Sequence, residues 1–165
     1  MKVTRLSSVA ACGGVFFVVA FVLVAALPHA AFAQGDLAAR VGTWKVNLVK
    51  STFDGPPPMS DTRTFQAYGD GVKATNEIVT ADGTRMTVKY AARYDGKDYP
   101  STGNPFYDTI AVEFLDAHTL QNTLKKAGKV VQRSTVVISN DGKVMTHTTT
   151  WNASGGHAVL IYDKQ

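Results

Sequence analysis

Residues 82–96 (DGTRMTVKYAARYDG) carry the clearest structural signal in the chain. Between its two Asp-Gly pairs the side chains alternate, so that Met86, Val88, Tyr90, Ala92 and Tyr94 fall on one face and mostly polar residues on the other. A period of two predicts a β-strand with one buried and one exposed side. Asp-Gly favours tight hairpin turns, because both central residues of such a turn need positive φ.

The same turn signals recur along the chain. Asp-Gly is also found at 54–55, 70–71 and 141–142, and further turn signals lie at 116–117, 127–128 and 154–156. Such regular spacing is typical of successive antiparallel hairpins. We predict nine or ten strands, at about Gly42–Lys50, Asp61–Tyr68, Val72–Thr80, Thr84–Tyr94, Lys97–Pro100, Tyr107–Leu115, Thr119–Lys125, Lys129–Ser139, Lys143–Trp151 and His157–Asp163.

These strands predict an all-β fold, an up-and-down antiparallel meander β-barrel. A meander with one apolar face buries that face by curling up, and closure also removes the exposed edges. A sandwich is the first alternative, but it usually needs longer Greek-key connections. An outer-membrane barrel is the second, and charged residues on nearly every strand argue against it. Only residues 36–41 suggest a short helical turn, leading into the first strand.

Residues 1–33 are typical of an export signal. Lys2 and Arg5 precede an uncharged apolar run over residues 9–27, Pro28 breaks it, and Ala31-Phe32-Ala33 offers a small-residue cleavage site. An uncleaved membrane anchor is the alternative, because the run approaches the length that spans a bilayer. Lipidation of Cys12 is disfavoured, since most of the apolar run follows that cysteine. We expect a periplasmic or extracellular protein whose barrel domain covers residues 34–165, without stable membrane insertion after cleavage.

Charge and motifs exclude several functions. With Lys2 and Arg5 set aside, 15 Lys and Arg remain against 13 Asp and Glu, without the basic stripe of a nucleic-acid-binding protein. No nucleophile motif or phosphate-binding loop is present, so we expect neither an enzyme nor a cofactor. His118, His147 and His157 lack metal-ligand spacing. His147 and His157 are placed to face each other across the last hairpin, but two neutral ligands alone do not predict a metal site.

Gly42-Thr43-Trp44-Lys45-Val46 resembles the Gly-x-Trp start of lipocalins and fatty-acid-binding proteins, whose Trp packs across the closed end of the barrel. The wider pattern, including residues 94–100, 102–105 and 162–165, is similar to secreted bacterial lipocalin-like proteins that are largely uncharacterised. Two departures concern the ligand. Pro56-Pro57-Pro58 forbids a helical lid after the first strand, and Leu160-Ile161-Tyr162 stands where the Arg-x-Tyr carboxylate clamp of the fatty-acid-binding proteins would be.

We therefore hypothesise a barrel that binds a small, mostly apolar ligand in its interior. The alternative is a filled-core structural or protein-interaction module without a ligand cavity. Inward-facing apolar residues supply most of the candidate ligand contacts, and two arginines are candidate head-group clamps, because an inward arginine needs an anionic partner. The predicted ligand-binding residues are Met86, Val88, Tyr90, Tyr94, Phe65, Phe114, Arg63 and Arg133.

Overall fold

The computed structural model describes residues 35–165. The expected export signal and Cys12 lie outside the described residues. A short helix α1 (Gly35–Arg40) precedes the strands, and a 3-10 turn η1 (Leu48–Lys50) follows the first of them. The strands are β1 (Gly42–Val46), β2 (Thr52–Phe53), β3 (Ser60–Tyr68), β4 (Gly71–Val79), β5 (Arg85–Arg93), β6 (Asp95–Thr102), β7 (Thr109–Phe114), β8 (Thr119–Lys126), β9 (Lys129–Ile138), β10 (Val144–Trp151) and β11 (His157–Lys164).

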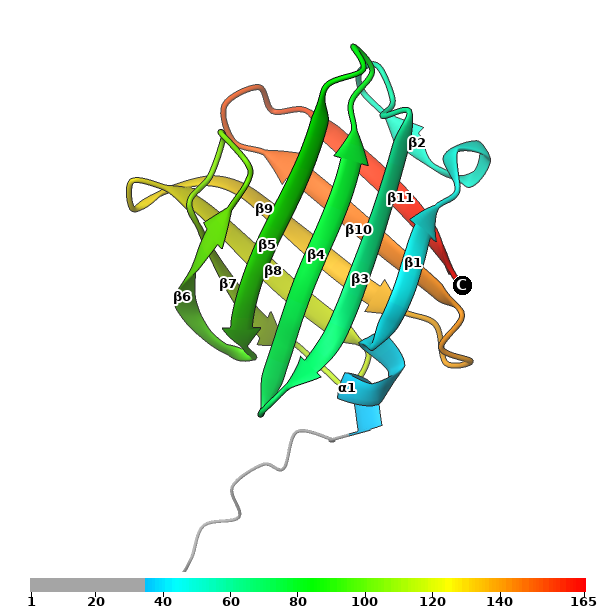
Figure 1. The fold of residues 1–165 in the computed structure, drawn as a ribbon, viewed down its shortest axis with the longest axis vertical. Coiled ribbons are helices and arrows are strands. Elements are labelled where there is room, and N and C mark those ends of the chain that lie inside the picture. The colour runs from blue at the N-terminus through cyan, green and yellow to red at the C-terminus, as the bar shows by residue number, and fades with distance from the viewer. Residues whose placement is uncertain (1–34) are drawn as a thin grey trace, which may run out of the picture.

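The strands form one antiparallel meander that closes on itself (Figure 1). From β3 to β11 each strand pairs with its successor in the chain, and β1 pairs with both β3 and β11. The closing register sets Trp44 opposite Lys164 and Val46 opposite Tyr162. The predicted up-and-down all-β barrel is confirmed. Among the described residues no helix is both long and apolar enough to cross a bilayer.

The first strand is shorter than the predicted Gly42–Lys50. β1 ends at Val46, because the Asn47 side chain accepts a hydrogen bond from the Lys50 amide (3.2 Å) and caps the turn η1. The backbone then rejoins β11 as β2, with Thr52 opposite Val159. Leu48, which falls within the predicted first strand, is therefore part of an exposed turn.

Three of the predicted Asp-Gly turns lie elsewhere than expected. Tyr68 pairs with Gly71, so the two loop residues between β3 and β4 are Gly69 and Asp70 rather than Asp70 and Gly71. Asp95 and Gly96 lie within β6, beside a register shift in its pairing with β7. Asp54 and Gly55 belong to the long connection from β2 to β3 and form no hairpin.

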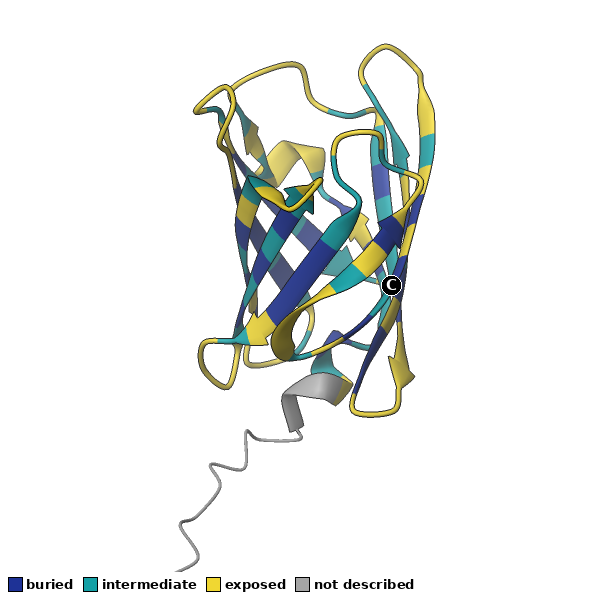
Figure 2. Ribbon diagram, turned by 90° about the vertical axis from the view of Figure 1, so that its left-hand side faces the viewer, coloured by how far each residue is buried: buried dark blue, intermediate teal, exposed yellow. Residues whose placement is uncertain are grey.

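The core follows the predicted alternation, seen as alternating buried and exposed segments along the strands (Figure 2). Along β5, Val88, Tyr90 and Ala92 are buried, whereas Arg85, Thr87, Lys89 and Arg93 are exposed. Trp44 is fully buried, and its indole Nε1 donates to the Arg40 carbonyl at 2.8 Å. This bond attaches α1, the helical turn expected near residues 36–41, to one end of the barrel. That end is closed.

Candidate functional site

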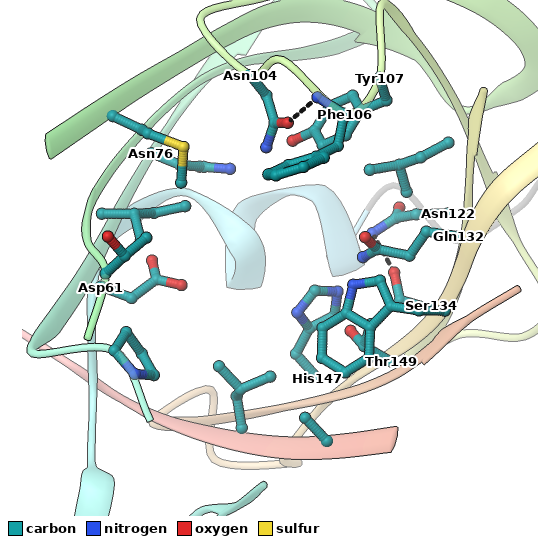
Figure 3. A pocket seen from close by; sticks show the side chains of 18 of the residues that line it. Asp61, Asn76, Asn104, Phe106, Tyr107, Asn122, Gln132, Ser134, His147 and Thr149 are labelled. Atoms are coloured by element: carbon teal, nitrogen blue, oxygen red, sulfur yellow. Dashed lines mark hydrogen bonds between the residues drawn. The ribbon is translucent and has the colours of Figure 1, made fainter. Parts of the chain in front are cut away.

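A cavity of about 550 Å³ occupies the barrel interior toward the end opposite α1. Its mouth lies among the connections that follow β2, β4, β6 and β10, and α1 is visible beyond its floor (Figure 3). Residues from these connections line the entrance: Pro56, Pro58, Thr80, Ala81, Asn104, Phe106, Ala153 and Ser154. Phe106 is 71% exposed, so an aromatic ring stands at the rim. The interior is hollow here, unlike the filled core of the alternative hypothesis.

Apolar side chains make up most of the cavity wall. They come from inward positions of strands all around the barrel, which is the expected result of period-two alternation on a closed sheet. The apolar wall residues are Phe53, Ile78, Met86, Ile110, Leu124, Val131, Trp151, Ala158 and Leu160. An apolar surface of this kind binds a ligand chiefly by removing the ligand's apolar area from water.

A charged pair lies in the same wall, on β3. Arg63 donates to Asp61 through Nε (3.2 Å) and Nη2 (2.9 Å), and Tyr162 donates its hydroxyl to Asp61 at 2.6 Å. The Arg63 guanidinium also lies 4.6 Å from the centroid of the Tyr162 ring. Burial opposes the charge on Arg63, but the carboxylate of Asp61 raises the pKa of Arg63 above its ordinary value. Asp61 therefore compensates the charge of Arg63 within the barrel.

His147, on β10, is held by the same arginine. Arg63 Nη1 lies 2.9 Å from His147 Nδ1. Since a guanidinium can only donate, Nδ1 must be the unprotonated acceptor and the proton of the neutral ring is on Nε2. Burial lowers the pKa of His147 well below its usual value, and the positive charges of Arg63 and Arg40 lower it further. In a metal-ligating histidine the second ring nitrogen donates instead, so this arrangement disfavours a metal ligand.

Four buried polar side chains form a continuous patch on neighbouring strands, which we call the polar wall: Asn122, Ser134, His147 and Thr149. Asn122 of β8 is opposite Ser134 of β9, and Ser134 is opposite Thr149 of β10. Asn122 Nδ2 donates to Ser134 Oγ at 3.3 Å. These side chains lie together on one side of the cavity, with Asp61 and Asn76 on the other (Figure 3).

Two tyrosines, Tyr90 and Tyr107, line the cavity, and Tyr162 is buried beside Asp61. Burial raises the pKa of Tyr107 to about 12, and it raises the pKa of Tyr162 well above its ordinary value. Both phenols are thus neutral near neutral pH. Tyr90, which lines the cavity, accepts a hydrogen bond from Arg40 Nη2 at 3.3 Å.

Three of the eight predicted ligand-binding residues line the cavity: Met86, Tyr90 and Arg63. The other five lie elsewhere. Val88 is fully buried in the barrel. Phe65 lies in the core beneath the Arg40 guanidinium, whose Cζ is 4.5 Å from the ring centroid. The rings of Tyr94 and Phe114 pack on each other, with centroids 4.7 Å apart.

Arg133 lies on the outer face of β9, where it is exposed and donates to Thr123 Oγ1 at 3.3 Å. It is therefore not placed as an interior clamp. The prediction that His147 and His157 face each other is wrong, because His147 is opposite Leu160 and His157 is opposite Thr150. Alternation with a fixed register puts His147 inside and leaves His157 exposed.

The polar wall was missed by the sequence reasoning, although one signal was available. Asn122 stands between Leu120 and Leu124 at inward spacing, so a polar side chain interrupts an apolar face. β10 gives no such contrast, because threonines occupy both of its faces (TTT at 148–150). The contact between His147 and Arg63 joins β10 to β3 across the interior, and no local pattern contains it.

No family model matches the chain, and no curated protein matches it. Among solved structures, it is similar to a redesigned β-barrel, b11L5F_LGL, with a TM-score of 0.49 and 12% identity over 79% of this chain and 95% of that one. It is also similar to the redesigned β-barrel mFAP1 bound to DFHBI, with a TM-score of 0.48 and 14% identity over 78% of this chain and 98% of that one.

Proposed function

We propose that this protein is an exported, lipocalin-like binding protein that takes a small, mostly apolar ligand into its barrel. The observation that carries the proposal is the interior cavity of about 550 Å³, whose wall is mainly apolar with a few converging polar groups. Small-molecule sites typically have such a size and such a lining. Each methylene group buried there contributes about 0.8 kcal/mol to binding.

The lipocalin-like part of the proposal is supported by Gly42 and Trp44. The Trp44 side chain is fully buried beside α1 at the closed end, where the Gly-x-Trp resemblance implies that it packs. The proposed role is binding without catalysis, cofactor or nucleic acid, in the periplasm or outside the cell.

Uptake of N-phenyl-1-naphthylamine, a neutral apolar dye whose fluorescence rises in apolar surroundings, tests the proposal. We expect saturable binding of the dye by the full chain. Ala158 is buried and lines the cavity, so Ala158→Phe fills part of it and should weaken binding about tenfold or more. Ala67 is exposed on β3, which makes Ala67→Phe the matched control with unchanged affinity. No uptake by the unmodified protein, or equal uptake by both variants, contradicts the proposal.

A further inference from the structure

Three polar atoms in the cavity wall have no hydrogen-bond partner among the described residues: His147 Nε2, Asn122 Oδ1 and Asn76 Oδ1. Buried polar atoms are nearly always paired, and those left over call for an explanation. All three belong to side chains that are at most 8% exposed. A ligand in the cavity would supply the missing partners.

The donor-only guanidinium of Arg63 fixes the role of His147 Nε2, and the orientation of the Asn122 amide gives that of Asn122 Oδ1. His147 Nδ1 accepts from Arg63, so His147 Nε2 carries a hydrogen and needs an acceptor. The amide nitrogen of Asn122 donates to Ser134 Oγ, so Asn122 Oδ1 is an acceptor and needs a donor. Both side chains belong to the polar wall and lie on the same side of the cavity (Figure 3). One group that both donates and accepts would satisfy them together.

A carboxylate does not fit this arrangement. Three of the five N–H groups of Arg63 donate to Asp61 and His147, and Asp61 already compensates its charge. The Asp61 carboxylate also lines the cavity, where it would repel a second anion. Asn76 and Asn122 present oxygens that a carboxylate has no hydrogen to pair with. Burying an anion without compensation is costly.

The other buried arginine, Arg40, is not among the residues that line the cavity. It donates to the Tyr90 hydroxyl and lies over the rings of Phe65 and Tyr94. Its Nε and Nη1 have no hydrogen-bond partner among the described residues, but they belong to a residue that does not line the cavity.

We infer that the ligand carries an uncharged head group that both accepts and donates a hydrogen bond, such as a hydroxyl or a carboxamide, and that this head group lies against the polar wall, where His147 Nε2 needs an acceptor and Asn122 Oδ1 needs a donor. The inference rests on the proposed ligand-binding function and specifies its ligand class. The apolar body of the ligand lies against Met86, Ile110 and Leu124. A fatty acid in its ionised form is excluded from the class.

Three two-ring probes of similar shape test the inference: naphthalene, 2-naphthol and 2-naphthoate. Naphthalene has no head group, 2-naphthol has a neutral head group that donates and accepts, and 2-naphthoate has an anionic head group. Titration calorimetry near neutral pH compares their affinities. We expect the full chain to bind 2-naphthol about tenfold more tightly than naphthalene, the increment of two ordinary hydrogen bonds. Binding of 2-naphthoate should be weaker than binding of 2-naphthol.

Variants assign the preference to the polar wall. Asn122→Leu is similar in shape and should reduce the preference for 2-naphthol over naphthalene to within about threefold. His147→Gln retains an acceptor for Arg63 and a donor for the ligand, and should keep the preference, whereas His147→Met should reduce it. Gln66→Leu, on the exposed face of β3, is the matched control. Thermal melting of each variant reports folding independently of binding.

The outcomes separate the two proposals. Three results would each overturn the head-group inference: equal affinity for naphthalene and 2-naphthol, the tightest binding for 2-naphthoate, or a preference for 2-naphthol that survives Asn122→Leu. Binding in the cavity would still stand in each case. Failure of all three probes and of N-phenyl-1-naphthylamine to bind would overturn the proposed function, and the inference with it.

Discussion

Asp61 and Arg63 stand two residues apart on β3 and form an ion pair inside the barrel, with side chains only 4% and 13% exposed. Alternation directs both side chains to the same, inner face. The alternation of β3 therefore places a carboxylate and a guanidinium together inside the barrel. The carboxylate also receives Tyr162, and the guanidinium also orients His147.

Asp61→Asn should destabilise the fold by about 3 kcal/mol or more, because it leaves the Arg63 charge buried without its counter-ion. Urea unfolding measures the change. Asp70→Asn is the matched control, since Asp70 pairs with Arg93 at the surface, with side chains 69% and 62% exposed, and exposed pairs contribute little. Equal losses in the free energy of unfolding would show that the interior pair stabilises the fold no more than the surface pair does.

Stability should depend on pH through His147. Its pKa is lowered in the fold by burial, then by Arg63 and Arg40, whereas the unfolded chain takes up a proton near pH 6.5. Unfolding therefore binds a proton as the pH falls below about 6.5, and the free energy of unfolding should fall by up to about 1.4 kcal/mol per pH unit. Denaturant unfolding at several pH values checks this. His147→Gln should flatten the profile between about pH 6.5 and 5, and an unchanged slope would exclude His147 as its source.

Gly103→Ala should be more destabilising than Gly128→Ala. Both glycines have positive φ, +82° and +77°. A methyl group at Gly103 would collide with the Thr87 carbonyl, whereas one at Gly128 would meet no atom within 4 Å. We expect about 1 kcal/mol for Gly128→Ala from backbone conformation alone, and about 2 kcal/mol or more for Gly103→Ala. Thermal unfolding compares them, and equal losses would refute the steric argument.

The two tryptophans should report on different places. Trp44 is fully buried, and Trp151 lines the cavity with 38% of its surface exposed. Acrylamide should therefore quench Trp151 and spare Trp44, and saturation with N-phenyl-1-naphthylamine should change the emission of Trp151. Trp151→Phe removes the quenchable component. Quenching that persists in this variant would mean that Trp44 is accessible.

The sequence predicts the fold well because its signals are local. Alternation in residues 84–94 identifies β5 and its inner face, and the Asp82-Gly83 turn separates it from β4. The predicted strand ends and turns are wrong where a local contact or backbone conformation overrides the sequence pattern. Asn47 caps a turn, so β1 ends earlier than predicted. Gly69 adopts a positive φ, whereas the Asp70-Gly71 pair predicts positive φ one position later.

The candidate site is less predictable because its contacts span the barrel. Met86 and Tyr90 follow from alternation on one strand, and they do line the cavity. Arg63 was recognised as inward, but its counter-ion Asp61 was not considered. The encounter of Arg63 with His147, 84 residues later, depends on the curvature and register of the whole sheet. Whether these residues bind a ligand stays a prediction.

The pairing of β1 with β11 has a consequence for how the molecule is made. The strand that contains Trp44 acquires its second neighbour only after residues 162–164 have been synthesised. Contacts between such distant parts of a chain form slowly, because a long loop must close first. Until residues 162–164 are available, the edge of β1 that pairs with β11 has no partner, and this last pairing closes the barrel.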